Sequence, residues 1–435
     1  MKNQTSEKLP KILVISHNCF SYSGSNGRTL GNFFEGYPKD KIAQFYIVNE
    51  EPDWDVCENY FRITDGEVVK GFYGLKKIGC CVKVKRINKN ESEENKKSNT
   101  LMRLKKNAIS LLVRELIWKN PFWNRKKIYT WIETFNPDII VYQAGNLGYL
   151  CELSVDIARK YNIPLVVYNS EGYYLKKYDY IKGKRSFSFW FSIYMLMFKK
   201  SFECLMKKAS SVIYISEDLE HAYKKIFDVP SHYIMTATSN IPIQRNKNEI
   251  KKISYLGNLG LGRYKSLIEI ATVLQRIDKK YTIDVYGNAP DKQIIDELEN
   301  TKGIYYRGIV SYEEVKNVIN HSDINIHVEG FDPFFVEDSK YAFSTKIADL
   351  LASRNILLMY APSNLTSTKY VVENECGCVI NNYNDLEYKL RELFENPEIQ
   401  KYYIENAEKI VEKNHNMERN KNKFLGILLN ESSAN

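Results

Sequence analysis

The sequence predicts an α/β protein of two domains, each built around a parallel sheet that is covered by helices. Short runs of Val, Ile and Leu alternate with amphipathic helical segments along the chain, which is typical of strands buried on both faces. This alternation stops in a polar stretch at 241–251 and then begins again. A chain of 435 residues also suits two domains better than one.

In the first half of the chain, several apolar runs are followed by helical patterns. The first run leads into Gly24-Ser-Asn-Gly27 and a helix over 30–34, and the second leads into a helix over 147–161. Ser216, followed by two acidic residues, predicts the N-cap of a helix over 219–226. The expected strands are 11–16, 138–142, 165–168 and 211–215.

The second half repeats this order. Apolar residues at helical spacing predict a helix over 264–277, and the segment from Pro397 onward is helical and charged. The expected strands are 253–256, 282–286, 304–306, 324–328 and 356–359.

Composition and charge narrow the class of protein. No run of 18 uncharged apolar residues occurs, so no transmembrane helix is expected, and the polar N-terminus does not resemble a secretory signal. The 8 cysteines have no paired metal-site spacing. We therefore expect reduced thiols, no metal site and a cytoplasmic location.

The net charge of +9 is concentrated in one segment, because residues 76–127 hold 16 Lys or Arg and 4 Asp or Glu. Residues 185–208 are aromatic and basic at both ends. Both segments favour peripheral binding to an anionic membrane surface; the alternative for 185–208 is a helix packed in the core. Nucleic acid is not an expected partner, since no reading motif accompanies the charge.

A glycine-rich loop follows the first strand of the second half, in the sequence YLGNLGLGRYKSLIEI. The helix after it opens with Arg263 and Lys265. A helix N-terminus and two cations favour an anion at such a turn. The glycines of the loop are Gly257, Gly260 and Gly262.

A second motif opens a helix further along. Ser344 and Thr345 are good N-cap residues, Lys346 lies in the first turn, and Asp349 follows one turn later. These groups could hold a phosphate and ribose hydroxyls. The alternative is an ordinary capped helix.

With both motifs in one predicted domain, the chain resembles a two-domain glycosyltransferase of the GT-B fold, nearest to glycosyltransferase family 4. That family has a Gly-Arg pair with a Lys five residues later, which falls on Gly257-Asn258 and Arg263. Its Glu-x7-Glu pattern falls on Tyr341 and Asp349. Its serine-lysine variant matches better, from Thr345 through Lys346 to Asp349 and Ala352.

The resemblance implies two Rossmann-like domains that face each other across a cleft. It also implies transfer of a hexose from a nucleotide diphosphate-sugar, with retention and without a metal or other cofactor. Arg263 and Lys346 are the expected groups that stabilise the leaving diphosphate. The expected donor-binding residues are Gly24, Gly27, Gly257, Asn258, Lys265, Glu329, Ser344, Thr345 and Asp349.

Two further carboxylates follow strands at their carboxyl ends. Glu171 lies where family members often carry a His, so it is a third catalytic candidate; the alternative is a solvated loop residue. Glu329 follows the strand over 324–328 and would face the donor. Asp53-Trp-Asp55 has the form of a DxD metal motif, but so short a pattern arises often by chance.

The expected domains are an acceptor-binding domain over 1–240, a nucleotide-sugar domain over 241–400, and a helical segment over 401–435 that packs back on the first. The predicted function is extension of a glycan acceptor, lipid-linked, for a surface polysaccharide. Two alternatives remain: a sugar-nucleotide epimerase, or a non-catalytic protein of the same fold that binds a nucleotide sugar or a partner. A dehydrogenase is disfavoured because GxGxxG is missing.

Overall fold

The computed structural model describes residues 9–22, 25–72, 78–84, 107–121, 123–179, 188–242 and 250–433. The chain forms two compact units, the first made of Met1–Ile234 with Glu418–Asn435 and the second of Met235–Met417. The chain thus enters the second unit a few residues before the expected boundary at 240. Of the expected C-terminal segment, only Glu418–Asn435 belongs to the first unit.

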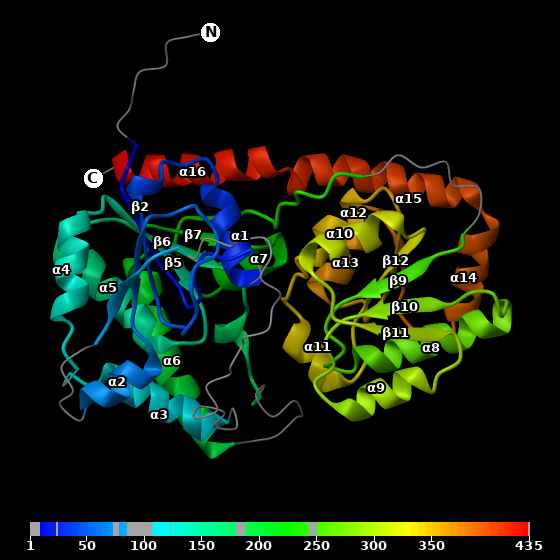
Figure 1. Ribbon diagram of the computed structural model, residues 1–435, viewed down its shortest axis with the longest axis horizontal. Helices are drawn as coiled ribbons and strands as arrows, with labels where there is room; N and C mark the ends of the chain where they lie inside the picture. The colour runs from blue at the N-terminus through cyan, green and yellow to red at the C-terminus, as the bar shows by residue number, and fades with distance from the viewer. Residues whose placement is uncertain are drawn as a thin grey trace, which may run out of the picture. The chain divides into compact units, whose positions relative to one another are not determined.

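The first unit is built on a sheet whose described strands have the order β4-β3-β2-β1-β5-β6-β7-β8 (Figure 1). Neighbouring strands are parallel, except that β4 runs antiparallel to β3. The strands are β1 (Ile12–Ile15), β2 (Ile42–Tyr46), β3 (Asn59–Arg62), β4 (Cys80–Val82), β5 (Ile139–Ala144), β6 (Leu165–Asn169), β7 (Ser211–Tyr214) and β8 (Ser231–Tyr233).

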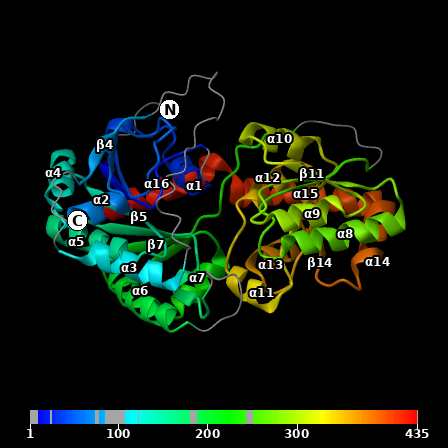
Figure 2. The same cartoon turned by 60° about the horizontal axis from the view of Figure 1, so that its bottom comes forward.

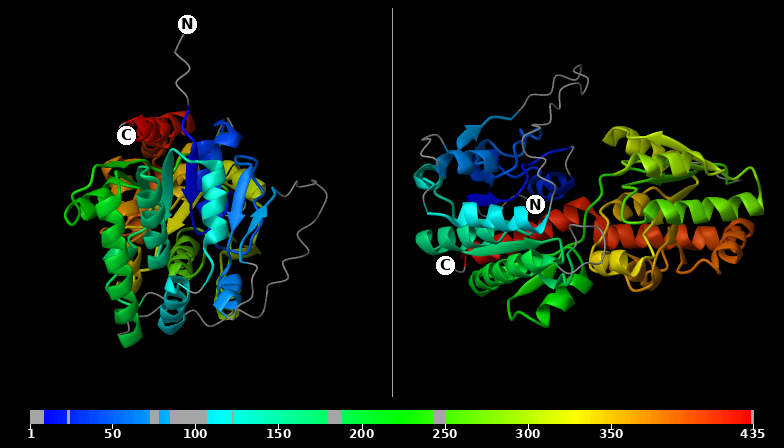
Figure 3. Two further views of the ribbon diagram at one scale, coloured as in Figure 1. Left: turned by 90° about the vertical axis from the view of Figure 1, so that its left-hand side faces the viewer. Right: turned by 90° about the horizontal axis from the view of Figure 1, so that it is seen from below.

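Helices cover this sheet, and α2, α3 and α6 lie side by side at one end of the unit (Figure 3). Ser216 caps α7 as expected, because its side chain accepts a hydrogen bond from Leu219 N. The helices are α1 (Ser25–Phe34), α2 (Asp65–Phe72), α3 (Ala108–Lys119), α4 (Lys126–Phe135), α5 (Gly148–Tyr161), α6 (Phe189–Lys208), α7 (Glu217–Lys224) and α16 (Met417–Ser433).

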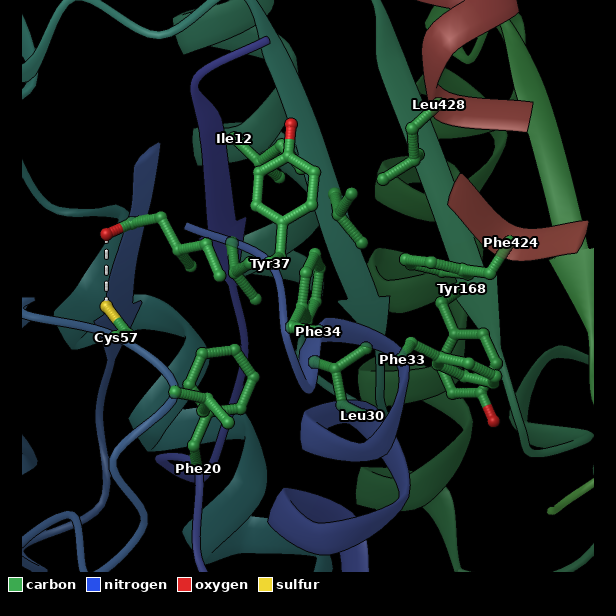
Figure 4. Close-up of a cluster of buried hydrophobic side chains, with 14 of the residues drawn as sticks. Ile12, Phe20, Leu30, Phe33, Phe34, Tyr37, Cys57, Tyr168, Phe424 and Leu428 are labelled. Atoms are coloured by element: carbon green, nitrogen blue, oxygen red, sulfur yellow. Dashed lines mark hydrogen bonds between the residues drawn. The ribbon is translucent and has the colours of Figure 1, made fainter. Parts of the chain in front are cut away.

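The core of the first unit is completed by the C-terminal helix α16 (Figure 4). The rings of Phe33 in α1 and Phe424 in α16 stack at 4.5 Å, and Phe33 also meets Tyr168 of β6 edge-on. Leu428 lies in the same buried cluster. Burial of such side chains is worth about 2 kcal/mol each, so α16 is an integral part of the first unit.

The second unit has a parallel sheet whose described strands have the order β11-β10-β9-β12-β13-β14, with helices on both faces (Figure 2). Its strands are β9 (Ile253–Leu256), β10 (Ile283–Tyr286), β11 (Ile304–Gly308), β12 (Ile324–Val328), β13 (Ile356–Tyr360) and β14 (Cys378–Ile380). Its helices are α8 (Arg263–Ile277), α9 (Lys292–Glu299), α10 (Tyr312–His321), α11 (Pro333–Ser339), α12 (Lys346–Ala352), α13 (Thr366–Glu373), α14 (Leu386–Glu395) and α15 (Pro397–Ile410), followed by the π-helical turn η5 (Val411–His415).

The two predicted parallel sheets are confirmed, and every strand expected from an apolar run is present within two residues. The sequence did not predict β2, β3, β4, β8 or β14, which are short or carry polar residues such as Gln44 and Asn59. Among the described residues, no helix is both long and apolar enough to cross a membrane.

Candidate functional site

The glycine-rich loop connects β9 to α8 at the carboxyl edge of the second sheet. Leu261 and Gly262 have left-handed backbone conformations, with φ of 55° and 77°. A Cβ at Gly330, in the loop after β12, would lie 2.2 Å from the Leu261 carbonyl oxygen. Only glycine at position 330 therefore lets these two loops touch, which holds the loop after β9 against the loop after β12.

Arg263 and Glu329 form a buried ion pair across those two loops. Arg263 Nε donates to Glu329 Oε2 at 2.9 Å and Nη2 donates to Oε1 at 3.1 Å. Ser266 Oγ donates to the Glu329 carbonyl at 2.8 Å, and His327 Nε2 lies 3.4 Å from Oε1. A bidentate pair of this kind fixes the orientation of the guanidinium.

The electrostatics of this pair follow from its burial. Burial alone would raise the pKa of Glu329, but His327 and Arg263 outweigh it and hold that pKa below its usual value. Burial would likewise lower the pKa of Arg263, and the Glu329 carboxylate instead raises it. Both groups are therefore ionised, and much of the Arg263 charge is already compensated inside the protein.

Lys346 lies beside the glycine loop. A Cβ placed on Gly257 would be 3.1 Å from Lys346 Nζ and 2.5 Å from Tyr255 Oη. Tyr255 Oη in turn donates to the Asn258 carbonyl at 2.8 Å. The structure thus joins the two motifs that the sequence placed far apart, and it brings an ammonium group to the turn where an anion was expected.

Asp349 is buried in α12 and has a partner that sequence reasoning missed. Thr238 Oγ1 donates to Asp349 Oδ1 at 2.6 Å, and Asn240 Nδ2 donates to the Asp349 carbonyl at 3.1 Å. Both partners precede β9, and no sequence motif singled them out. Thr238 restricts the rotamer of Asp349 and so fixes where its carboxylate lies in the first turn of α12, while Asn240 holds the backbone there.

The remaining donor-binding candidates of the second unit have different surroundings. Asn258 is exposed, and its Oδ1 accepts a hydrogen bond from Gly260 N at 2.7 Å, so it stabilises the turn in which it lies. Lys265 is exposed. Thr345 occupies the N-cap position of α12, but its side chain accepts no capping bond there. Ser344 precedes it and is partly buried.

The first-unit candidates are Gly24, Gly27 and Glu171, and Gly24 lies outside the described residues. A Cβ at Gly27 would lie 2.2 Å from the Cys19 carbonyl oxygen, so this glycine is needed for the close approach of α1 to the segment after β1. Glu171 follows β6 and is partly exposed, and its carbonyl lies 3.5 Å from Tyr223 Oη.

The acidic pair in Asp53-Trp-Asp55 has protein partners. Asp53 Oδ1 accepts a hydrogen bond from Tyr22 N at 2.8 Å, and Lys39 forms an ion pair with Asp55. Within the part of the chain that the structure describes, no three His, Cys, Asp or Glu side chains are grouped as metal ligands would be.

Chemically, the second unit offers an ammonium group, an oriented guanidinium and a tight glycine turn at one sheet edge. These groups suit a diphosphate, and the neighbouring carboxylate of Asp349 suits a hydroxyl group such as that of ribose. Parallel α/β sheets bind their ligands at this edge, beyond the carboxyl ends of the strands.

Solved structures similar to this chain include glycosyltransferases and related synthases. Anabaena Alr3699/HepE, solved in complex with UDP, has a TM-score of 0.64 at 11% identity, with 97% of this chain and 100% of that chain covered. Sucrose-phosphate synthase from Thermosynechococcus elongatus has a TM-score of 0.64 at 12% identity, covering 98% and 99%. A glycosyltransferase from Rickettsia africae has a TM-score of 0.57 at 13% identity, covering 97% and 98%.

The chain therefore has the GT-B fold, and the predicted fold class is confirmed. Residues 268–426 match a family model described as glycosyl transferase-like, so the expected resemblance to GT-B glycosyltransferases is confirmed as well. Assignment to family 4 stays a prediction. No curated protein matches the sequence of this chain.

Sequence reasoning also missed a second way to place the Glu-x7-Glu pattern. Glu337, in α11, lies eight positions after Glu329, so these two acids have the required spacing, whereas Tyr341 begins the other placement without an acid. The signal was present in the sequence. The structure adds that Glu329 is the buried partner of Arg263 and that Glu337 is partly exposed.

Proposed function

We propose that this protein is a glycosyltransferase that takes a sugar from a nucleotide diphosphate-sugar bound at the carboxyl edge of the second sheet. The observation that carries the proposal is the position of Lys346 Nζ beside Gly257, with Arg263 opening the next helix. The GT-B fold and the glycosyl transferase-like match over 268–426 support it. The UDP and UDP-glucose complexes of Alr3699/HepE support a nucleotide-sugar donor.

In this reaction the bond between the anomeric carbon and the diphosphate breaks, and a bond to an acceptor hydroxyl forms. The leaving diphosphate gains negative charge, and the acceptor proton passes to one of its oxygens. Lys346 and the backbone N–H groups of the glycine loop stabilise that charge, while Arg263 contributes a guanidinium held in place by Glu329. Asp349 accepts hydrogen bonds from the ribose.

Several finer points belong to the same proposal. We propose transfer of a hexose with retention at the anomeric carbon, without a metal ion, to a lipid-linked glycan of a surface polysaccharide. Lys346 and Arg263 supply positive charge that a divalent cation would otherwise supply. Glu171 is the proposed first-unit group that contacts the sugar or the acceptor. A cytoplasmic enzyme at the inner face of the membrane would meet such an acceptor.

The first test is a thermal-shift screen of the full chain with UDP, GDP, ADP and dTDP and their common sugars. A ligand that binds only the native state raises its stability, by about 2.7 kcal/mol at a hundred times the dissociation constant. One nucleoside diphosphate is expected to raise the unfolding temperature. Binding of none of them would overturn the donor assignment.

The second test compares Lys346→Ala and Arg263→Ala with Lys279→Ala, an exposed lysine at the opposite, amino-terminal edge of the sheet. The first two variants should lower turnover at least tenfold, because the cations act on charge that develops during the reaction. Lys279→Ala should keep wild-type turnover. Donor binding without release of nucleoside diphosphate would identify a non-catalytic binding protein instead. Full loss of activity in EDTA would refute metal independence.

A further inference from the structure

Helix α6 presents a stripe of side chains that does not face the core of the first unit. Phe189, Ile193, Leu196, Lys200 and Lys207 follow one another at spacings of three, four or seven residues, so they share one face of the helix. Leu196 is 73% exposed and Phe189 is 63% exposed. The stripe is apolar in its first half, and its second half carries Lys200, Glu203 and Lys207.

The start of α6 is well defined. The Ser188 side chain accepts a hydrogen bond from Phe191 N and caps the helix, and the rings of Phe189 and Trp190 meet edge-on at 5.5 Å. Two large aromatic side chains are therefore held at the surface by the first turn of a capped helix. Glu203, on the second half of the stripe, accepts a hydrogen bond from Tyr174 Oη at 2.8 Å.

Helix α3 adds a second exposed apolar stripe. Ile109, Val113 and Leu116 lie at spacings of four and three, and all three are about half exposed. The opposite side of α3 is buried, and includes Trp118. An amphipathic helix normally turns its apolar residues inward, so a second apolar stripe that faces outward requires another explanation.

These two stripes belong to neighbouring helices. Helices α3 and α6 pack along each other (Figure 3), and Lys119 Nζ at the end of α3 donates to Ser201 Oγ in α6 at 2.9 Å. We call the exposed apolar side chains of these two neighbouring helices the docking surface; they are Ile109, Val113, Leu116, Phe189, Trp190 and Leu196.

Charge decides which partner fits this surface. Lys200 and Lys207 continue the α6 stripe and are exposed, and α6 ends in the basic pair Lys207-Lys208. Apolar and aromatic side chains beside lysines match the interface of an anionic bilayer, where acyl chains lie below negative head groups.

We propose that the docking surface on α3 and α6 binds the first unit to an anionic lipid bilayer, with the aromatic side chains of Phe189 and Trp190 entering the head-group region. A lipid-linked acceptor requires such a contact with the membrane, so this proposal rests on the proposed function. Lipid binding itself needs neither donor nor acceptor.

The test is co-flotation of the full chain with vesicles of phosphatidylcholine alone or with 30% phosphatidylglycerol. Leu196→Glu and Leu116→Glu should each lower partitioning to the anionic vesicles at least tenfold. Ile309→Glu is the matched control, because Ile309 is equally exposed at 73% but lies in the second unit. It should float like the wild type, and circular dichroism should show all three variants folded.

Tryptophan fluorescence gives an independent measurement. Trp190 is about half exposed, Trp131 is partly buried against Phe61, and Trp54, Trp118 and Trp123 are buried. Brominated lipids should quench the wild type, and Trp190→Phe should lose most of that quenching. In 0.5 M NaCl the partitioning should fall several-fold, because salt screens the lysines.

Three results would overturn the proposal. The first is no flotation at low salt, and the second is equal flotation of Leu196→Glu and Ile309→Glu. The third is a wild-type dimer in light scattering that Leu196→Glu dissociates, since the surface would then join two copies. Flotation by a protein without transferase activity would support the docking surface and count against the proposed reaction alone.

Discussion

The ion pair between Arg263 and Glu329 can be tested by Glu329→Gln, which removes one charge and keeps the size of the side chain. Gln accepts one hydrogen bond from the guanidinium through its oxygen. Its amide group, however, would meet the second guanidinium N–H donor-to-donor. The variant therefore leaves the positive charge of Arg263 inside the second unit with one of its two hydrogen bonds and without the negative charge of its partner.

The size of the effect follows from the burial of the pair. The Glu329 side chain is 8% exposed and that of Arg263 is 20% exposed, with a shortest separation of 2.8 Å between Nη2 and Oε2. Breaking a buried pair by removing one partner costs about 3–5 kcal/mol. We expect about 3 kcal/mol, the lower end, because Arg263 keeps some contact with water.

The assay can separate the two units, because all 5 tryptophans of the chain lie in the first. In urea, tryptophan fluorescence reports the first unit and should not change. Far-UV circular dichroism reports both, and its second-unit transition should move to lower urea. With a slope of about 2 kcal/mol/M, the midpoint should fall by about 1.5 M.

The matched control is Asp284→Asn, which weakens the surface pair of Asp284 and Arg307 at 2.7 Å in the same unit. A pair exposed to this degree contributes about 0–1 kcal/mol. If Glu329→Gln costs no more than Asp284→Asn, then Arg263 does not depend on Glu329, and its proposed orientation by that carboxylate is refuted.

Three further predictions concern pH and the glycine loop. Burial raises the pKa of Glu115, in the first unit, to about 7 from 4.5, against the opposing effects of Lys119 and two helix N–H groups. A raised carboxyl pKa favours folding at low pH, so the free energy of unfolding of the first unit should fall by about 3 kcal/mol as the pH rises from 4.5 to 7. In unfolding followed by tryptophan fluorescence, Glu115→Gln should abolish this dependence on pH. Burial lowers the pKa of His415, in the second unit, to about 4 from 6.5. The free energy of unfolding of that unit, measured by circular dichroism, should therefore fall by about 3 kcal/mol as the pH falls through this range. If the stability of both units changed with pH in the same direction, these assignments would be contradicted. Gly330→Ala should weaken binding of nucleoside diphosphates at least tenfold, because its Cβ would displace Leu261. The control Gly426→Ala, in open space on α16, should bind normally and gain about 1 kcal/mol in stability. Equal affinities of the two variants would show that the contact between the two loops is not needed.

Much of the fold could be predicted because its strands are continuous apolar runs. β9 (ISYL) and β12 (INIHV) have the expected bounds, since every residue of each strand is buried and most of them are apolar. β3 and β8 could not be found in this way. They are short and partly polar, and they exist because a neighbouring strand pairs with them.

The sequence indicated which residue types lie near the glycine loop and α12, but not how they pair. The sequence indicated cations after the glycine loop and at the start of α12, and both are at the carboxyl edge of the sheet. It did not indicate that Arg263 is held by Glu329 or that Thr238 orients Asp349. The Thr345 side chain was expected to suit a cap, and the structure shows no capping bond from it.

The sequence by itself determined where strands, the glycine loop and helix starts lie, because these depend on residues within a few positions of one another. Only the tertiary structure decided that the charge of Arg263 is compensated by Glu329 and that the carboxylate of Asp349 is held by Thr238. Those contacts join residues 66 and 111 positions apart, and a contact of that range depends on how whole strands are ordered in the sheet. Local periodicity does not indicate that order, and the proximity of Lys346 to Gly257 depends on the pairing of β9 with β12.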